Sequence, residues 1–343
     1  MSITFKRMIF MKKLFSIMLI ATVLCSCSQT VPTTVTPSGP PEDIITPEAT
    51  FYSEITSSKE RPIAVMIDND EESARPQAGL EDAYLVYEIT VEGAATRFMA
   101  LFKNYDVAKV GPVRSARHYF LDYALENDAI YTHAGQSPQA GRDIAALGMI
   151  DINGLSGLDG QYFHRDYTHT SSWHTLYTGT DKLAELAEAK GIRKESDELI
   201  YKYNEQDTEI DGQPASEFAL PYAPFYRVTY EYNTDAKVYE RSINGALHKS
   251  QSGVTLSAKN VIVLYIDNYN LNDGTNAGRQ ELDNIGSGKG FYMTNGQYKQ
   301  ITWSKSSRRA KTVIKDESGA EITLNPGTTY VQIIPESKAV TIR

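Results

Sequence analysis

The chain has 343 residues, a formal net charge of −9 and only two cysteines. The length allows two domains of ordinary size. The mildly negative charge argues against non-specific binding to nucleic acid, so we expect no nucleic-acid partner.

The N-terminus has the pattern of a secretory signal. A basic segment precedes the apolar segment LFSIMLIATVL at 14–24, which is too short to cross a membrane comfortably. The apolar segment ends in LCSC, which resembles a bacterial lipobox with Cys27 as the residue that receives the lipid, such as palmitate. We therefore expect a signal peptide over 1–26 and lipidation at Cys27. Met11 is an alternative start, and an ordinary secretory signal is the alternative interpretation.

Lipidation at Cys27 would leave the mature chain without another cysteine, and hence without a disulfide or a thiolate metal site. The protein would then act outside the cytoplasmic membrane, anchored to it, which argues against ATP chemistry. Residues 27–57 are rich in Ser, Thr and Pro and predict a flexible tether.

Strands and helices alternate in the following region, 58–200, which predicts an α/β domain with a mixed sheet. A buried strand over 63–67 ends in acids, and the next two strands form a hairpin. Ser137 is a good helix N-cap, Pro138 suits the first helical position and Gly148 suits the end of that helix. The other predicted elements are strands from 84 and 96, a helix over 116–127, strands from 128 and 149, and a helix from 180.

A polar segment, 201–217, predicts a linker to a second domain over 218–343. That domain has many strand-like segments separated by Asn-Gly, Asp-Gly and Ser-Gly turns, which is typical of antiparallel β structure. The predicted fold class is therefore α+β: a mixed-sheet α/β N-terminal domain followed by a mainly antiparallel β C-terminal domain.

The segment GPVRSARHYF at 111–120 places basic residues at the start of a helix, where acidic side chains are normally preferred. A second helix start follows the Gly-containing turn after His133. Free backbone amides at such turns, together with arginines, bind phosphate or carboxylate well. We expect an anion site built from basic residues of this region: Arg114, Arg117, His118, His133, Arg97 and Arg142. The alternative is that nearby carboxylates hold these arginines in structural ion pairs.

Four acidic residues could act as acid or base near such a site, or hold a divalent ion: Asp68, Asp70, Glu92 and Asp122. We expect no metal site, and the alternative is a separate site in the loop formed by His164, Asp166, His169 and His174. The spacing of these histidines matches no known zinc motif. Signatures of common hydrolases, nucleotide-binding loops and dinucleotide-binding folds are missing from the sequence. We expect no cofactor, with a divalent metal as the alternative.

Several segments carry a family resemblance: RPIAVMIDND, ARPQAGLEDAYLVYEITVEGAATRFMALF, VGPVRSARHYFLDYA, AIYTHAGQSPQA, HTLYT, ALHKSQSG, NVIVLYID and GSGKGFY. They look like those of the YerB-like bacterial lipoproteins, and the likeness covers nearly all of the chain after the tether. The resemblance implies the two-domain layout and the membrane anchor but no activity. The family pattern has Asn where this chain has Thr175, and often an acidic residue where it has Lys249–Gln251. Any role that needs that Asn or that acid is in doubt here.

The order of elements around GPVRSAR and IYTHAGQSPQA is also loosely similar to that of the LytR–CpsA–Psr enzymes, which transfer wall polymers from a polyprenyl pyrophosphate carrier. Three functions follow as hypotheses. The protein binds an anionic wall polymer or lipid-linked precursor, or it is an envelope phosphotransferase or hydrolase, or it is a scaffold for an envelope protein partner. The sequence does not decide whether the protein is catalytic.

Overall fold

The computed structural model describes residues 47–343 except residues 172 and 276. The predicted signal peptide, the lipidation site Cys27 and the tether up to residue 46 lie outside the described residues. The tether prediction was wrong at its end, because Pro47–Ser57 form helix α1. Phe51 and Tyr52 lie one turn before Ile55 on this helix, and all three pack against the core, which stabilises it.

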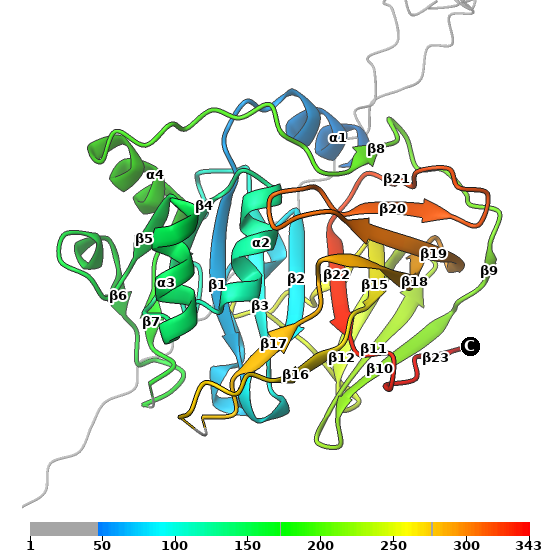
Figure 1. The fold of residues 1–343 in the computed structure, drawn as a ribbon. Helices are drawn as coiled ribbons and strands as arrows, with labels where there is room; N and C mark the ends of the chain where they lie inside the picture. The colour runs from blue at the N-terminus through cyan, green and yellow to red at the C-terminus, as the bar shows by residue number, and fades with distance from the viewer. Residues whose placement is uncertain (1–46, 172, 276) are drawn as a thin grey trace, which may run out of the picture. The chain divides into compact units, whose positions relative to one another are not determined.

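The first half of the described chain alternates strands and helices, as predicted (Figure 1). Its elements are β1 (Ile63–Asn69), β2 (Leu85–Thr90), β3 (Thr96–Phe102), α2 (His118–Glu126), β4 (Ile130–His133), α3 (Pro138–Leu147), β5 (Asp151–Asn153), β6 (His164–Arg165), β7 (Leu176–Tyr177) and α4 (Thr180–Ala189). Short 3-10 helices cover Glu72–Ala74, Leu80–Asp82, Glu92–Ala94 and Asp159–Tyr162. Strands β2 and β3 form the predicted hairpin.

The second half is mainly antiparallel β structure, as predicted. Its strands are β8 (Lys202–Tyr203), β9 (Gln213–Pro214), β10 (Glu217–Ala223), β11 (Tyr226–Asn233), β12 (Val238–Ile243), β13 (Ala246–Leu247), β14 (Ser257–Ala258), β15 (Asn260–Tyr265), β16 (Asn268–Asn270), β17 (Gln280–Leu282), β18 (Gly286–Thr294), β19 (Gln297–Lys305), β20 (Val313–Asp316), β21 (Thr323–Leu324), β22 (Thr329–Ile334) and β23 (Thr341–Ile342). The predicted linker contains β8 and β9, which pair with β21 and β19, and its Tyr201 and Tyr203 are buried.

One 11-stranded sheet runs through both halves, in the order β20-β19-β18-β15-β22-β2-β3-β1-β4-β5 with β9 beside β19. Strand β22 lies parallel to β2, from Leu85 opposite Thr329 to Ile89 opposite Ile333. On its other side, β22 also pairs in parallel with β15. A late strand of the chain therefore joins the two halves into a single sheet. A second, six-stranded sheet in the order β13-β12-β11-β10-β23, with β14 beside β12, belongs to the second half.

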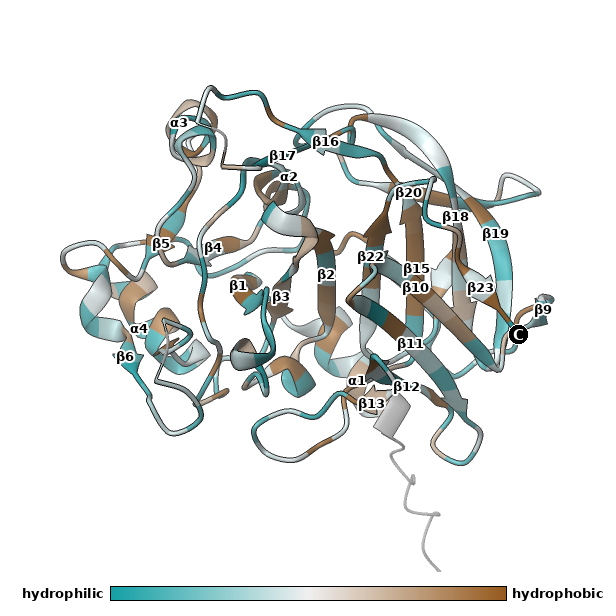
Figure 2. Cartoon of the chain, turned by 90° about the horizontal axis from the view of Figure 1, so that it is seen from below, coloured by the Kyte–Doolittle hydropathy of each residue, from teal (hydrophilic) through white to brown (hydrophobic). Residues whose placement is uncertain are grey.

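The two faces of the large sheet carry two separate cores, because side chains alternate along each strand. On β1, Ala64 and Met66 face the core that contains α2, whereas Ile63, Val65 and Ile67 face the core that contains the six-stranded sheet. Figure 2 shows that the strands of the large sheet are apolar and that the helices and loops around them are more polar.

Local signals set the ends of α3 as predicted. The Oγ of Ser137 accepts a hydrogen bond from the amide of Ala140, and Gly148 closes the helix in the left-handed conformation with φ of 58°. Within the described part of the chain, no helix is long and apolar enough to cross a membrane.

Candidate functional site

The loop at 111–117 lies across the ends of two strands. The amide of Arg114 donates to the carbonyl of Met66 on β1, and the amide of Ala116 donates to the carbonyl of Gly135, just after β4. These backbone bonds fix the loop beside the C-terminal half of β1 and the end of β4. Arg114 and Arg117 are thereby held beside the acidic end of β1 and the start of α2.

Arg114 is held between two carboxylates and an aromatic ring. Its Nε pairs with Asp68, and its Nη2 donates to Oδ2 of Asp70 at 3.2 Å. The guanidinium lies 4.4 Å from the centre of the ring of Trp173, which is 63% exposed. Such a cation over an exposed indole is attracted to it electrostatically. Arg114 is therefore ordered from two sides.

Arg117 forms a forked ion pair. Its Nε and Nη2 donate to the two carboxylate oxygens of Glu92 at 2.6 and 2.9 Å. Although burial alone would raise it, the pKa of Glu92 is lowered by this pairing. Glu92, expected as an acid, a base or an ion-holding residue, thus forms an ion pair with Arg117, which is what the structural alternative describes.

Arg97 on β3 is the most buried arginine of this group, at 3% exposure. Its Nη1 donates to the carbonyl of Ser115 at 2.7 Å, while its Nε has no hydrogen-bond partner among the described residues. Burial lowers its pKa, and the positive charge of Arg117 lowers it further. A buried donor without an acceptor is costly, so Arg97 has capacity for a further acceptor.

Helix α2 begins next to these arginines without a side-chain cap. Arg117 occupies the N-cap position with extended φ and ψ, and the first turn has no acidic residue. The positive end of the helix dipole therefore adds to the charge of the arginines.

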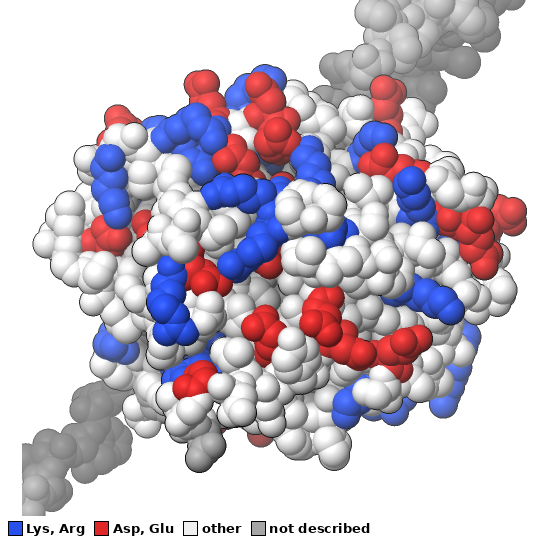
Figure 3. Space-filling view, viewed as in Figure 1, with Lys and Arg blue, Asp and Glu red and all other residues white. Residues whose placement is uncertain are grey.

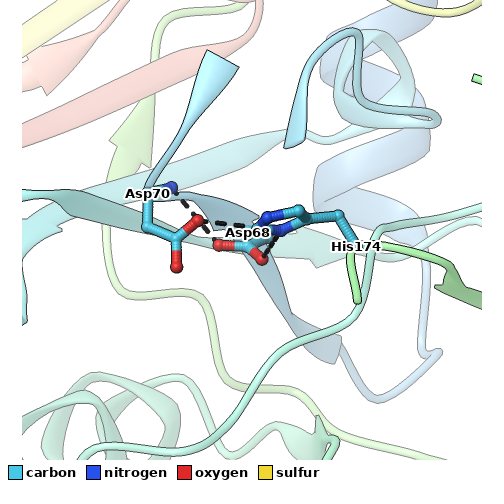
Figure 4. A group of neighbouring side chains, drawn as sticks. All are labelled: Asp68, Asp70 and His174. Atoms are coloured by element: carbon cyan, nitrogen blue, oxygen red, sulfur yellow. Dashed lines mark hydrogen bonds and ion pairs between the residues drawn. The ribbon is translucent and has the colours of Figure 1, made fainter. Parts of the chain in front are cut away.

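Beside the arginines, Asp68, Asp70 and His174 form a compact cluster (Figure 4). Nδ1 of His174 lies 2.6 Å from Oδ2 of Asp68 and 3.7 Å from Oδ1 of Asp70. Although burial alone would raise it, the hydrogen bond from His174 and the charges of Arg97 and Arg114 lower the pKa of Asp68 to about 2. Burial and the negative charge of Asp68 raise the pKa of Asp70.

His174 is buried in this cluster. Burial by itself would lower the pKa of His174, but the hydrogen bond to Asp68 and the charges of Asp68 and Asp70 raise it above its usual value. The imidazole is thus biased toward its protonated form. Asp68 orients the imidazole ring through the hydrogen bond to Nδ1.

Other predicted site residues lie in separate contacts. His133 contacts Asp151 and the carbonyl of Gly135, and Arg142 donates to Gln139 on the exposed side of α3. His118 faces Glu281 of the second half at 2.8 Å. The six basic residues of the expected anion site therefore have different partners, and Arg97, Arg114 and Arg117 are the ones whose charges act on one another.

Asp122 is buried on α2 and pairs with Arg308 and Asn284 instead of the arginines of the 111–117 loop. Burial raises its pKa. The predicted loop metal set is also dispersed, because Asp166 pairs with Lys109 whereas His164 and His169 are exposed. His174 alone of that set joins a carboxylate cluster, with partners 106 and 104 positions earlier in the chain.

Sequence reasoning missed the pairing of His174 with Asp68 and the stacking of Trp173 on Arg114. Asp68 and His174 are each part of a segment that carries the family resemblance, RPIAVMIDND and HTLYT respectively. No local periodicity connects the two segments, so their contact has no signal in the sequence. Chemically, the region offers the guanidinium group of Arg97, whose Nε has no acceptor among the described residues, beside a cluster of two carboxylates and an imidazole.

On the upper half of Figure 3, basic and acidic side chains are interspersed, so that face has no broad surface of one charge.

Two family models match the chain. Residues 50–193 match "Protein of unknown function (DUF3048) N-terminal domain", and residues 218–331 match "Protein of unknown function (DUF3048) C-terminal domain".

A known relative and a solved structure are similar to the chain over most of its length. It is 30% identical over 295 residues to the Bacillus subtilis (strain 168) protein named "Putative lipoprotein YerB", covering 83% of this chain and 84% of that protein. The crystal structure of YerB protein from Bacillus subtilis matches with a TM-score of 0.73 and 27% sequence identity, covering 83% of this chain and 94% of that chain. The resemblance to YerB-like lipoproteins is confirmed, and the chain belongs to the DUF3048 family, whose N- and C-terminal domains it carries in order.

Proposed function

We propose that the protein is a lipoprotein anchored outside the cytoplasmic membrane through Cys27, and that it binds an anionic group of an envelope ligand at Arg97, Arg114 and Arg117. The lipobox-like LCSC segment and the similarity to a protein named as a lipoprotein support the anchor. The anion is a phosphate or carboxylate, as borne by wall polymers and lipid-linked precursors. We call these three arginines the arginine cluster.

The observation that carries the proposal is the buried Nε of Arg97, which has no acceptor among the described residues. Burial and then the charges of Arg117 and Arg114 lower the pKa of Arg97, whereas the charges of Asp68 and Glu92 raise it; a further negative charge nearby would favour the charged guanidinium. The uncapped start of α2 points the same way, since helix N-termini bind anions through their amides. Arginines suit phosphate and carboxylate because their donors form a planar fork.

The test is a thermal-shift titration of the full chain in detergent with phosphate and with pyrophosphate, both in EDTA. We expect either anion to raise the melting temperature by mass action, and we expect Arg117→Gln to weaken binding at least tenfold, or about 1.4 kcal/mol. Arg142→Gln is the matched control, because Arg142 is an exposed arginine held by Gln139 outside the arginine cluster. A folded protein that no anion stabilises, or equal binding by Arg117→Gln and Arg142→Gln, would contradict the proposal.

A second candidate is a scaffold for an envelope protein, and the ion pairs favour it. Arg114 and Arg117 already have carboxylate partners in Asp68, Asp70 and Glu92, as a purely structural cluster would. The titration separates the two, since a structural cluster gives no anion-dependent shift. If pyrophosphate binds and is hydrolysed to phosphate over time, the protein would instead be an envelope phosphotransferase or hydrolase.

A further inference from the structure

We propose that Asp68, Asp70 and His174 form a binding site for one divalent transition-metal cation, of which Mn²⁺ and Zn²⁺ are the best suited. We call these residues the Asp–His cluster. The metal ligands are not atoms of the anion site, although the two sites adjoin at Arg114, which pairs with Asp68 and Asp70.

The first argument is geometric. The Asp–His cluster offers one ligand atom from each residue, and these atoms all lie within 4.8 Å of one another. Two of the separations are 2.6 and 3.7 Å, both from Nδ1 of His174. Ligands that sit about 2.1 Å from a metal ion lie about 3 to 3.5 Å from each other, so small side-chain movements would complete the site.

The second argument is an oxygen atom that lacks a hydrogen bond. Oδ1 of Asp70 is shielded from solvent and has no hydrogen-bond partner among the described residues, and it faces the ring of His174 (Figure 4). An ionised carboxylate oxygen removed from water requires a donor or a cation. A metal ion between Asp70 and His174 satisfies this oxygen directly.

The third argument concerns charge and position. Two carboxylates stand close together at the end of β1, and the guanidinium of Arg114 is the cation that now bridges them. A divalent ion would take over this role and free Arg114, whose side chain is 16% exposed, to move toward solvent. Asp68 and His174 have fully buried side chains, whereas that of Asp70 is 19% exposed, which leaves an entry path from that side.

The identity of the ion follows from the donor set. Two carboxylates with one imidazole suit Mn²⁺ or Zn²⁺, whereas Ca²⁺ and Mg²⁺ prefer oxygen ligands alone. The imidazole must lose a proton before it binds the metal, so binding should be tighter at higher pH.

The experiment uses the full chain in detergent, stripped with EDTA and held in phosphate-free buffer. Mn²⁺ is titrated while the electron paramagnetic resonance signal of the free ion is measured, and Zn²⁺ is tested by thermal shift. We expect one Mn²⁺ per chain, with tighter binding at pH 8 than at pH 6. Asp70→Asn and His174→Gln should each weaken binding at least tenfold. Asp166→Asn is the matched control, an aspartate of the neighbouring loop that pairs with Lys109, and it should bind as the wild type does.

Three results would overturn the proposal: no Mn²⁺ or Zn²⁺ binding by folded wild-type protein up to millimolar concentration, binding that Asp70→Asn and His174→Gln leave unchanged, or equal loss in Asp166→Asn. Circular dichroism in EDTA shows whether each variant is folded, and the partly exposed Asp70 provides the variant most tolerant of substitution. Because the anion titration contains EDTA and the metal titration contains no phosphate, either proposal can fail while the other stands.

Discussion

At the scale of single residues, the most unusual feature is a charged network inside the core between the two sheets. Glu88 on β2 and Arg241 on β12 pair at 2.8 Å, and both side chains have no exposed surface. Arg241 also donates to Nδ1 of His248, whose Nε2 contacts Oε1 of Gln77 at 2.7 Å. Since arginine can only donate, Nδ1 of His248 must carry no proton, and the ring is neutral.

This network predicts an acid sensitivity carried by one residue. Burial, with the charges of Arg241 and Arg75, lowers the pKa of His248 far below its usual value. The unfolded chain therefore binds a proton below about pH 6.5 that the folded chain does not, and stability falls as the pH drops. His248→Gln should remove about 2 kcal/mol of the difference in unfolding free energy between pH 7 and pH 5, measured by urea denaturation.

The control for this change is His169→Gln, because His169 is exposed. It should leave the pH dependence as in the wild type. If His248→Gln and wild type lose the same stability between the two pH values, His248 is not the residue responsible.

At the scale of elements, helix α2 joins the two halves through one polar stripe. His118, Asp122 and Glu126 are spaced four apart, so they lie on one face of the helix. They contact Glu281, Arg308 and Lys305 of the second half, respectively. Lys305 and Glu126 are nearly fully buried and 2.6 Å apart, and Glu126 also accepts from Tyr87 and Thr312.

Removing one partner of this buried pair should be costly. Lys305→Met leaves the charge of Glu126 buried without its cation, which should lower the unfolding free energy by about 3–5 kcal/mol. The double variant Lys305→Met/Glu126→Gln should recover part of that loss. Urea denaturation measures both.

Lys311→Met provides the comparison, since Lys311 and Glu198 form an ion pair whose side chains are 43% and 52% exposed. Its loss should change the unfolding free energy by about 0–1 kcal/mol. Equal effects of Lys305→Met and Lys311→Met would show that burial does not set the strength of the Lys305 pair.

The elements themselves were largely predictable, because their signals are local. Ser137, Pro138 and Gly148 mark the two ends of α3, and β-branched and aromatic residues mark the strands of the β2–β3 hairpin. The candidate sites were not predictable to the same extent. The contact between Asp68 and His174 spans 106 positions and arises only when the segment just before β7 packs against the end of β1. Helix α1 was missed because its Ser-, Thr- and Pro-rich composition resembles the preceding tether.

At the scale of the whole molecule, the two family domains share one hydrogen-bonded sheet. Strand β22 lies between β2 of the first half and β15 of the second, and both pairings are parallel. Without β22, the edge of β2 has no partner strand, and the core on either face of the sheet is open. The halves therefore depend on each other for stability.

A fragment that ends at residue 200 should fail to fold by itself, whereas the full chain should unfold in one cooperative transition. Nuclear magnetic resonance spectra of the fragment should lack dispersed amide signals, and its thermal melt by circular dichroism should show no cooperative step. A fragment with dispersed signals and a sharp melt would show that the first half is an independent folding unit. In that case, adding the separate second half should not change the spectra or the melt of the fragment.

The position of β22 also sets when the large sheet can be completed. Residues 329–334 form β22, which follows every other strand of that sheet in the chain, yet they supply a middle strand. During synthesis, β2 must therefore wait for these residues before it gains its partner. The same arrangement makes completeness a condition of stability, because a product cut short before residue 329 presents an unpaired strand edge to proteases and to other chains.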